Sequence, residues 1–185
     1  MNYSRALLAA TACACITFLG ASAVASTPTA ANKQAEPKGA YGQIIFYDGD
    51  GNKHCMLSVP ETKQFFDLAD DSQSCTNNQV ASFSLENIPS ATLIHFYRTE
   101  VCSDAKVQGN FFVKLKTVKQ PTDWSNPSPN PPATMNFDDF RKLDPGYLVP
   151  KKFIRIEDRW PVPDVHESWD EQISCVYIER SQPVY

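Results

Sequence analysis

The stretch that decides the fold is NQVASFSLE, residues 78–86. Within it, apolar side chains occupy positions 81, 83 and 85, whereas polar side chains occupy positions 82, 84 and 86. An alternation with a period of two is typical of a β-strand that buries one face. The stretch therefore predicts a strand whose Phe83 and Leu85 face a hydrophobic core.

This strand has a counterpart near the end of the chain. The segment EQISCVYIE at 171–179 repeats it 93 positions later, and IIFY at 44–47 returns as IHFY at 94–97, 50 positions later. Short similarities also arise by chance in β-rich chains, but both pairs keep their order and inward register, as stacked sheets require. We therefore predict two repeated motifs that pack face to face. The residues expected to meet in their shared core are Phe83, Leu85, Val176 and Ile178.

The rest of the chain adds short β-type runs and almost no helical periodicity. A dense turn signal, DGDGN at residues 48–52, lies between the apolar run at residues 43–47 and a second β-type run at residues 55–59. It predicts a hairpin in which these two runs pair. One short helix is expected from Asn136, as its cap, to Leu143. The predicted strands besides residues 80–86 lie at residues 43–47, 55–59, 92–97, 111–115, 153–156 and 173–179.

An extra segment interrupts the second motif at residues 119–166. It is rich in proline, which breaks both helices and sheet ladders. We interpret it as one long insertion in the second motif. The sequence thus predicts an all-β domain over residues 41–180, made of two motifs and one insertion.

The first 25 residues predict a cleavable signal peptide. Arg5 precedes an apolar run that ends in small residues at 23–25, as at a signal-peptidase site. A membrane anchor is the alternative, but the run contains polar residues and is barely long enough to span a bilayer. Residues 26–40 offer little to bury and predict a disordered leader. We therefore expect a secreted or periplasmic protein without a membrane span after signal removal.

The exported chain would carry a modest negative charge. Without Arg5 it has 16 basic and 21 acidic side chains, which leaves a net charge of −5 with the signs interspersed. This balance argues against nucleic acid and anionic membranes as partners.

Four cysteines remain once Cys13 and Cys15 leave with the signal peptide. An even number in an oxidising compartment predicts two disulfides, and the spacing does not choose among the three connectivities. Zinc is disfavoured because no pair has the close spacing of zinc ligands. The disulfide candidates are Cys55, Cys75, Cys102 and Cys175.

Two segments resemble the βγ-crystallin superfamily. The first is the hairpin, FYDGDGN at 46–52 with residues 55–59. The second is NNQVAS at 77–82, which is similar to the family's calcium signature of two Asn or Asp, two free positions, Ser or Thr, then Ser; DEQISC at 170–175 fits more loosely. The resemblance implies a sandwich of two Greek-key motifs. Small secreted microbial members include protease inhibitors, killer toxins and calcium-binding stress proteins.

The resemblance also implies calcium as the one cofactor to consider. Ala81 lacks the hydroxyl that the signature requires, and Glu171 and Cys175 depart from it in the second copy. With fewer oxygen ligands, any site would be weak or single. The same side chains could instead simply close turns. The calcium candidates are Asn77, Asn78, Gln79, Asp170 and Ser174.

No arrangement of catalytic residues is recognisable. His54, His95 and His166 lie in different segments without a Ser or Cys nucleophile in a known motif. The neighbouring carboxylates Glu157 and Asp158 would point to opposite faces of a strand, whereas a glycosidase needs two that face each other. We expect a protein without enzymatic activity, with an exported hydrolase as a lesser alternative.

Aromatic side chains in and beside the insertion predict a binding surface. Rings on proline-stiffened loops lose little conformational freedom on contact, although they would equally well cover a sheet edge. We expect a secreted or periplasmic binder of a protein or a cell-envelope macromolecule, acting as an inhibitor, toxin or antagonist. The alternative is a calcium-binding structural or stress protein. The partner-binding candidates are Trp124, Tyr147, Trp160 and Trp169.

Overall fold

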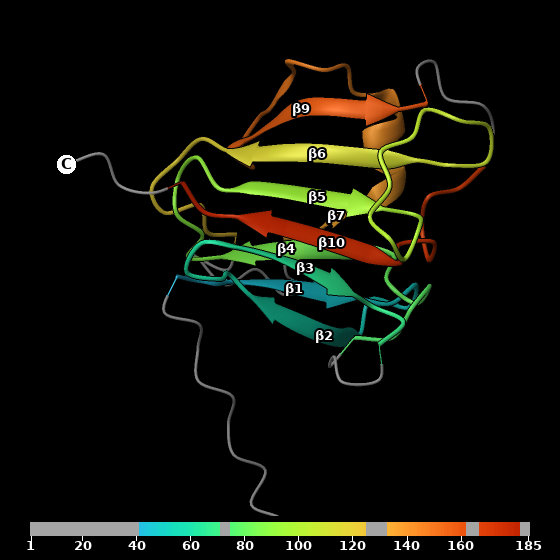
Figure 1. The fold of residues 1–185 in the computed structure, drawn as a ribbon. Coiled ribbons are helices and arrows are strands. Elements are labelled where there is room, and N and C mark those ends of the chain that lie inside the picture. Colours follow the sequence, from blue (N-terminus) through green and yellow to red (C-terminus); the bar gives the residue numbers. More distant parts are fainter. Residues whose placement is uncertain (1–40, 71–74, 125–132, 162–166, 182–185) are drawn as a thin grey trace, which may run out of the picture. The chain divides into compact units, whose positions relative to one another are not determined.

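The computed structural model describes residues 41–70, 75–124, 133–161 and 167–181 (Figure 1). All of them belong to one unit of the chain, residues 36–185. The predicted signal peptide, the predicted leader and part of the predicted insertion lie outside the described residues. Within the described ranges, no helix has the length and apolar character to cross a membrane.

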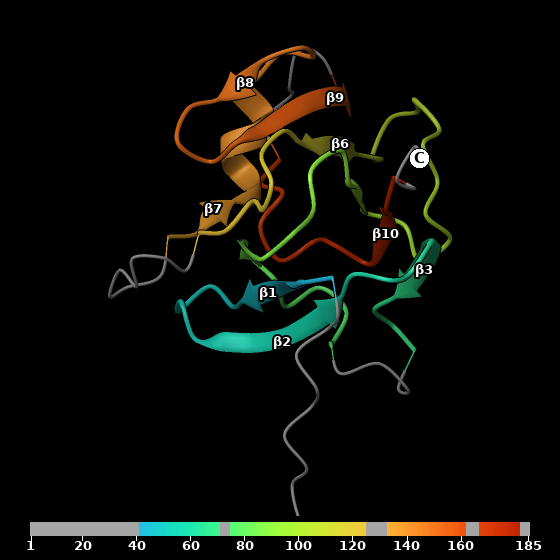
Figure 2. The same cartoon turned by 90° about the vertical axis from the view of Figure 1, so that its left-hand side faces the viewer.

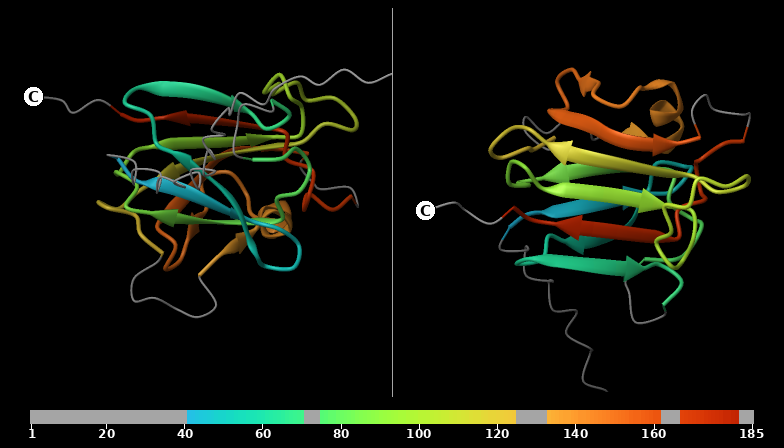
Figure 3. Two further views of the ribbon diagram at one scale, coloured as in Figure 1. Left: turned by 90° about the horizontal axis from the view of Figure 1, so that it is seen from below. Right: turned by 45° about the horizontal axis from the view of Figure 1, so that its top comes forward.

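The described residues form two antiparallel sheets, which confirms the prediction of an all-β fold. In the first sheet the strand order is β2 (Lys53–Ser58), β1 (Gln43–Tyr47), β4 (Ser82–Glu86) and β7 (Met135–Asn136). In the second sheet (Figure 3) the order is β3 (Lys63–Asp67), β10 (Cys175–Glu179), β5 (Leu93–Tyr97), β6 (Phe112–Thr117), β9 (Ile154–Trp160) and β8 (Leu148–Val149).

The predicted helix is a short 3-10 helix, η1 (Phe137–Lys142). Asn136 occupies the N-cap position, as predicted, but its side chain makes no capping hydrogen bond. Instead the backbone N–H of Asp138, in the first turn, donates to Asp170 Oδ1 at 3.1 Å. The first turn is therefore capped from a distant segment, which local sequence does not reveal.

The two predicted repeats pair their strands in the same register. Between β1 and β4, Phe46 lies opposite Phe83. Between β5 and β10, Phe96 lies opposite Val176. These partners are the ones that the spacings of 50 and 93 equate, and Ile44–Leu85 and Ile94–Ile178 follow the same rule. The similarity in sequence therefore corresponds to two equivalent strand pairs, one in each sheet.

Each half of the chain places one strand in the other half's sheet (Figure 2). Strand β3, from the half that contains β1–β4, pairs with β10. Strand β7, from the half that contains β5–β10, pairs with β4. Neither sheet is complete without the other half, so the two halves depend on each other for backbone hydrogen bonds.

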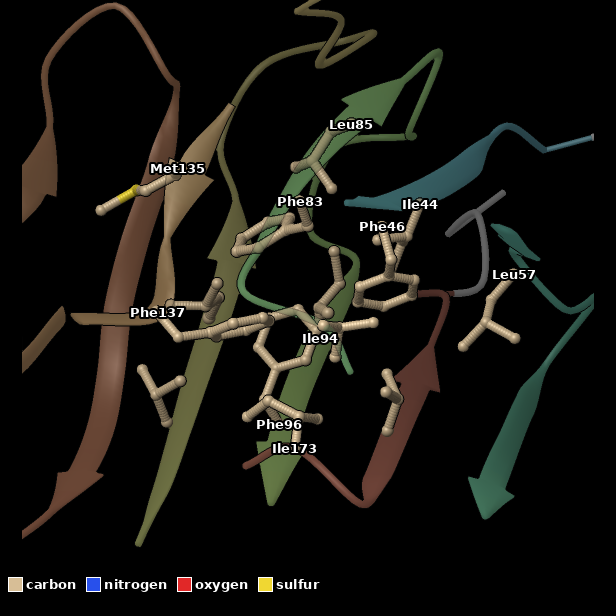
Figure 4. Close-up of a cluster of buried hydrophobic side chains, with 14 of the residues drawn as sticks. Ile44, Phe46, Leu57, Phe83, Leu85, Ile94, Phe96, Met135, Phe137 and Ile173 are labelled. Carbon is tan, nitrogen blue, oxygen red and sulfur yellow. The ribbon is translucent and has the colours of Figure 1, made fainter. Parts of the chain in front are cut away.

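One hydrophobic core joins the two sheets (Figure 4). The ring of Phe96 in the second sheet lies 4.8 Å from that of Phe83 and 6.1 Å from that of Phe46, both in the first sheet. Phe137 and Phe140 of η1 stack on Phe83 from the side, with centroids 5.4 and 6.0 Å away. The four residues predicted to share the core all belong to this cluster: Phe83, Leu85, Val176 and Ile178.

Two disulfides form between the four predicted cysteines. Cys55 of β2 pairs with Cys75, and Cys102 of the β5–β6 loop pairs with Cys175 of β10. The second bond spans 73 residues and the first spans 20. Because cross-links over longer loops remove more entropy from the unfolded chain, we expect stabilisation of about 4 and 3 kcal/mol respectively.

Gly42 gives a test of the packing at the start of β1. Its φ is +90°, and a Cβ there would lie 2.5 Å from the backbone oxygens of Glu86 and Asn87. We expect Gly42→Ala to lower the free energy of unfolding by about 2–4 kcal/mol, because strain and a backbone clash add. Urea unfolding of the purified variant measures this loss.

The matched control is Gly51→Ala. Gly51 has a φ of +80° but nothing within 4 Å of an added Cβ. It should lose only about 1 kcal/mol, from backbone strain alone. Equal losses in both variants would contradict the role assigned to the backbone contact at Gly42.

Candidate functional site

Two turns from the two halves of the chain lie against each other and frame the candidate site. We name residues 77–79 and 170–172 the paired turns. Asn78 has a φ of 55° and Glu171 a φ of 59°. The N–H of Asn78 donates to the carbonyl of Ile173, and the N–H of Glu171 donates to that of Val80. The two turns therefore bond reciprocally, at positions 93 residues apart.

An open surface depression of about 470 Å³ lies beside the paired turns. Its lining is almost entirely polar and draws on both turns and on the β5–β6 loop. Such a hollow offers a ligand several polar side chains, although their apolar stems also contribute to its surface. The lining residues are Asn77, Asn78, Arg98, Thr99, Glu100, Glu171, Gln172 and Ser174.

Two amide oxygens of this lining are buried and have no hydrogen-bond partner: Asn77 Oδ1 and Gln172 Oε1. The amide orientations are defined, because Asn77 Nδ2 donates to Glu100 Oε1 at 3.2 Å and Gln172 Nε2 donates to the carbonyl of Ser168 at 2.5 Å. A buried polar atom without a partner costs about 1–3 kcal/mol. Each oxygen would gain free energy from a cation or a hydrogen-bond donor once a small movement of the lining admitted one.

The structure brings three of the five calcium candidates together. Asn77, Asn78 and Ser174 line the depression, and the Ser174 hydroxyl donates to Asn78 Oδ1 at 3.2 Å. Gln79 is exposed and does not line it. Asp170 is turned toward η1, where burial raises the pKa of its carboxyl although the N–H of Asp138 opposes the shift.

Sequence reasoning missed the carboxylates of the site. The spacing of 93 equates Glu171 with Asn78 and Gln172 with Gln79. The repeat in the sequence therefore already pointed to Glu171 and Gln172 as site residues. Nothing in the sequence pointed to Glu100, because the β5–β6 loop reaches the site only in three dimensions. The β1–β2 turn also lies close to the turn at residues 170–172, since a Cβ at Gly49 would lie 2.6 Å from Glu171 Oε1.

The side chains of the lining carry oxygen atoms and one guanidinium group, that of Arg98. No group of three or more His, Cys, Asp or Glu side chains placed to hold a metal occurs in the part of the chain that the structure describes. The depression instead combines amide, hydroxyl and carboxylate oxygens. Calcium accepts such mixed oxygen ligands, including backbone carbonyls, at six to eight positions.

Two of the four tryptophan and tyrosine candidates for partner binding are buried. Trp124 is 5% exposed and donates from Nε1 to the carbonyl of Lys152 at 2.7 Å. Trp169 is 2% exposed and stacks on Phe111 with the centroids 4.8 Å apart. Burial removes both from a set of surface anchors, since packing already uses their rings. Trp160 is half-buried, and Tyr147 is 46% exposed.

His95 packs on the outer face of the second sheet. Its Nδ1 lies 3.1 Å from the Tyr97 hydroxyl, and its ring centroid lies 5.0 Å from that of Tyr177. Burial lowers the pKa of His95 to about 4, and the positive charge of Lys114 acts in the same direction. The imidazole is therefore neutral in the folded protein at neutral pH.

This low pKa predicts a loss of stability in mild acid. Below pH 6.5 the unfolded chain binds a proton at His95 that the folded chain does not bind until about pH 4. The free energy of unfolding should therefore fall between pH 6.5 and pH 4, by about 2 kcal/mol from this residue after allowance for its partial exposure. In His95→Phe, which keeps a ring but cannot titrate, urea unfolding should show a correspondingly smaller fall.

The same series contains its own control. Between pH 8 and 9 the difference in stability between wild type and His95→Phe should stay constant, because His95 is neutral in both folded and unfolded chains there. An identical fall in both proteins below pH 6.5 would contradict the assignment.

Comparisons of this chain with protein-family models, with curated proteins and with solved structures find no match.

Proposed function

We propose that this chain is an exported, non-enzymatic binding protein on a βγ-crystallin-like scaffold of two Greek-key motifs. Three observations support the scaffold: the two equivalent strand pairs, the exchange of β3 and β7, and the reciprocal bonds of the paired turns. The two disulfides support an oxidising compartment.

The proposed ligand of the paired turns is calcium. The observation that carries this proposal is that two residues lining one depression, Asn77 and Gln172, each have an amide oxygen without a hydrogen-bond partner. Glu100 and Glu171 add negative charge, whereas Arg98, which also lines the depression, reduces it. Ligand charge sets affinity, so we expect a dissociation constant of about 0.1–1 mM, as in extracellular calcium modules.

Bound calcium would act as a structural link between the halves of the domain. Its ligands come from residues 77–78 of one half and from residues 171–174 of the other. The unfolded chain does not hold these oxygens together. An ion that binds only the folded state raises its stability according to the ratio of concentration to dissociation constant.

Calcium should therefore raise the melting temperature. At about ten times the dissociation constant the gain is roughly 1.4 kcal/mol, which corresponds to about 3–6 °C for a domain of this size. Calorimetry of the mature protein in 10 mM calcium, compared with the same buffer containing a chelator, measures the shift.

Glu171→Gln is the variant that tests the site, because it removes one charge from the depression without changing the shape of the side chain. We expect it to lose at least half of the calcium shift. The matched control is Glu157→Gln, which removes a carboxylate from β9 that pairs with Arg155. No shift in wild type, or the same shift in both variants, would refute calcium binding at the paired turns.

A second proposed function is the binding of a protein or a cell-envelope macromolecule through the β8–β9 hairpin. Three large apolar side chains of this hairpin are exposed: Tyr147, Leu148 and Phe153. The hairpin forms one edge of the second sheet (Figure 2). Apolar side chains that gather into an exposed patch mark interaction surfaces, and an unpaired sheet edge can accept a partner.

The test uses the double variant Tyr147→Ser with Leu148→Ser. Immobilised wild-type protein should retain a defined component of the producing organism's envelope fraction, and the double variant should lose it, because two apolar anchors are gone. Val101→Ser is the control, since Val101 is exposed in a different loop. Retention by the double variant would contradict this proposal.

A further inference from the structure

Strand β3 forms the edge of the second sheet that lies farthest from β8. It lies beside β10, on the side away from β5 (Figure 1), and among the described residues it pairs with no other strand. It spans five residues, Lys63–Asp67, whereas β8 at the opposite edge spans two. An edge strand of this length can pair with another chain unless its side chains prevent the contact.

The odd-numbered residues of β3 direct their backbone groups away from β10. The N–H of Leu68 donates to the carbonyl of Ser174 at 2.8 Å, and the N–H of Arg180 donates to that of Thr62 at 2.8 Å. Because the bonded residues alternate along an antiparallel strand, these two bonds show that the even-numbered residues of β3 face β10. The N–H and C=O groups of the odd-numbered residues therefore face the unpaired edge.

The side chain at the middle of this edge is apolar and exposed. Phe65 is 61% exposed, and its ring centroid lies 4.6 Å from that of Tyr177. The Tyr177 ring lies 5.0 Å from that of His95. A row of rings thus crosses three strands on the outer face of the sheet. It ends at the unpaired edge on Phe65, since no described strand lies beyond it.

The charges of β3 fit a second copy of the same strand. Lys63 and Asp67 lie two positions to either side of Phe65, and all three side chains are on the outer face of the sheet. If two antiparallel copies meet about a two-fold axis at Phe65, each Lys63 lies opposite the second copy's Asp67. Opposite charges directly across two strands attract each other, and like charges repel. The lysine, which commonly discourages edge pairing, therefore favours this register.

We propose that two copies of this chain pair along β3 and form a closed dimer with one continuous sheet. The odd-numbered residues of the two strands form about six backbone hydrogen bonds in this register, and the two Phe65 rings meet on the axis. Identical surfaces satisfy each other, so the assembly stops at two copies. The dimer does not depend on calcium at the paired turns or on the β8–β9 hairpin.

The dimer should be weak and reversible, because a contact along five residues buries less area than a standard interface. We expect a dissociation constant of about 10–100 µM. Sedimentation equilibrium of the mature protein between about 5 and 500 µM measures it, and the mean mass should rise from one chain toward two.

Hydrogen exchange followed by NMR shows where the two copies meet. The Phe65 N–H faces the unpaired edge, so its exchange should slow about fourfold between about 20 µM and 1 mM protein. The Phe66 N–H faces β10 within one chain, and its exchange should not depend on concentration. This measurement uses the wild-type chain, so it holds even if substitutions disturb the strand.

Two charge variants test the register. Lys63→Glu and Asp67→Lys each place like charges opposite each other at both ends of the contact, and each should weaken the dimer about tenfold. An equimolar mixture of the two variants restores opposite charges at both ends and should associate as a mixed pair. Asp67 Oδ1 also accepts from the N–H of Ala69 at 2.9 Å, so melting curves establish that Asp67→Lys is folded. If it is not, Lys63→Glu and the exchange pattern decide the outcome.

The matched control is Lys53→Glu, which makes the same change of charge at an exposed lysine of β2, an edge strand of the first sheet. It should leave the association unchanged. A protein that stays monomeric at about 500 µM overturns the proposal, as does an exchange rate of the Phe65 N–H that is independent of concentration. Equal weakening by Lys53→Glu and Lys63→Glu, or no association in the mixture of the two folded charge variants, also overturns it.

Discussion

The whole arrangement depends on the contact of Phe96 with Phe83 and Phe46 across the two sheets. Each sheet has one apolar face, and neither can leave it in water, so the faces are buried against each other. The exchange of β3 and β7 adds backbone hydrogen bonds to this apolar contact. The packing of the core and the pairing of the strands thus impose the same relative placement of the two halves. This placement brings the paired turns at residues 77–79 and 170–172 together.

Strands β4 and β6 could be predicted because their apolar and polar residues alternate. Strand β3 could not, since Phe65 and Phe66 are adjacent and one of them lies on each face. Phe65 is 61% exposed, and its ring centroid lies 4.6 Å from that of Tyr177 on the outer face of the sheet. An apolar residue on the outer face removes the alternation of apolar and polar residues by which a strand is recognised. Strands β7 and β8 span two residues each, too few to form a pattern.

The candidate site was only partly predictable, for a different physical reason. The resemblance in sequence marked Asn77, Asn78 and Ser174, which do meet. The property that makes the depression a candidate site is an unmet hydrogen bond at Asn77 and at Gln172. Whether an amide oxygen has a partner depends on what its nitrogen contacts, and those contacts, Glu100 and the Ser168 carbonyl, come from folding.

The exchanged strands have a consequence for how such a chain could arise. A polypeptide containing only β1–β4 would have an open position beside β4 and a spare strand, β3. Two copies related by a two-fold axis could fill each other's open position, because closed symmetric dimers satisfy identical surfaces mutually. The equal registers of the two strand pairs are what tandem fusion of such a dimer would leave behind. On that view, the paired turns occupy the former symmetry axis, and their divergence dates from after the fusion.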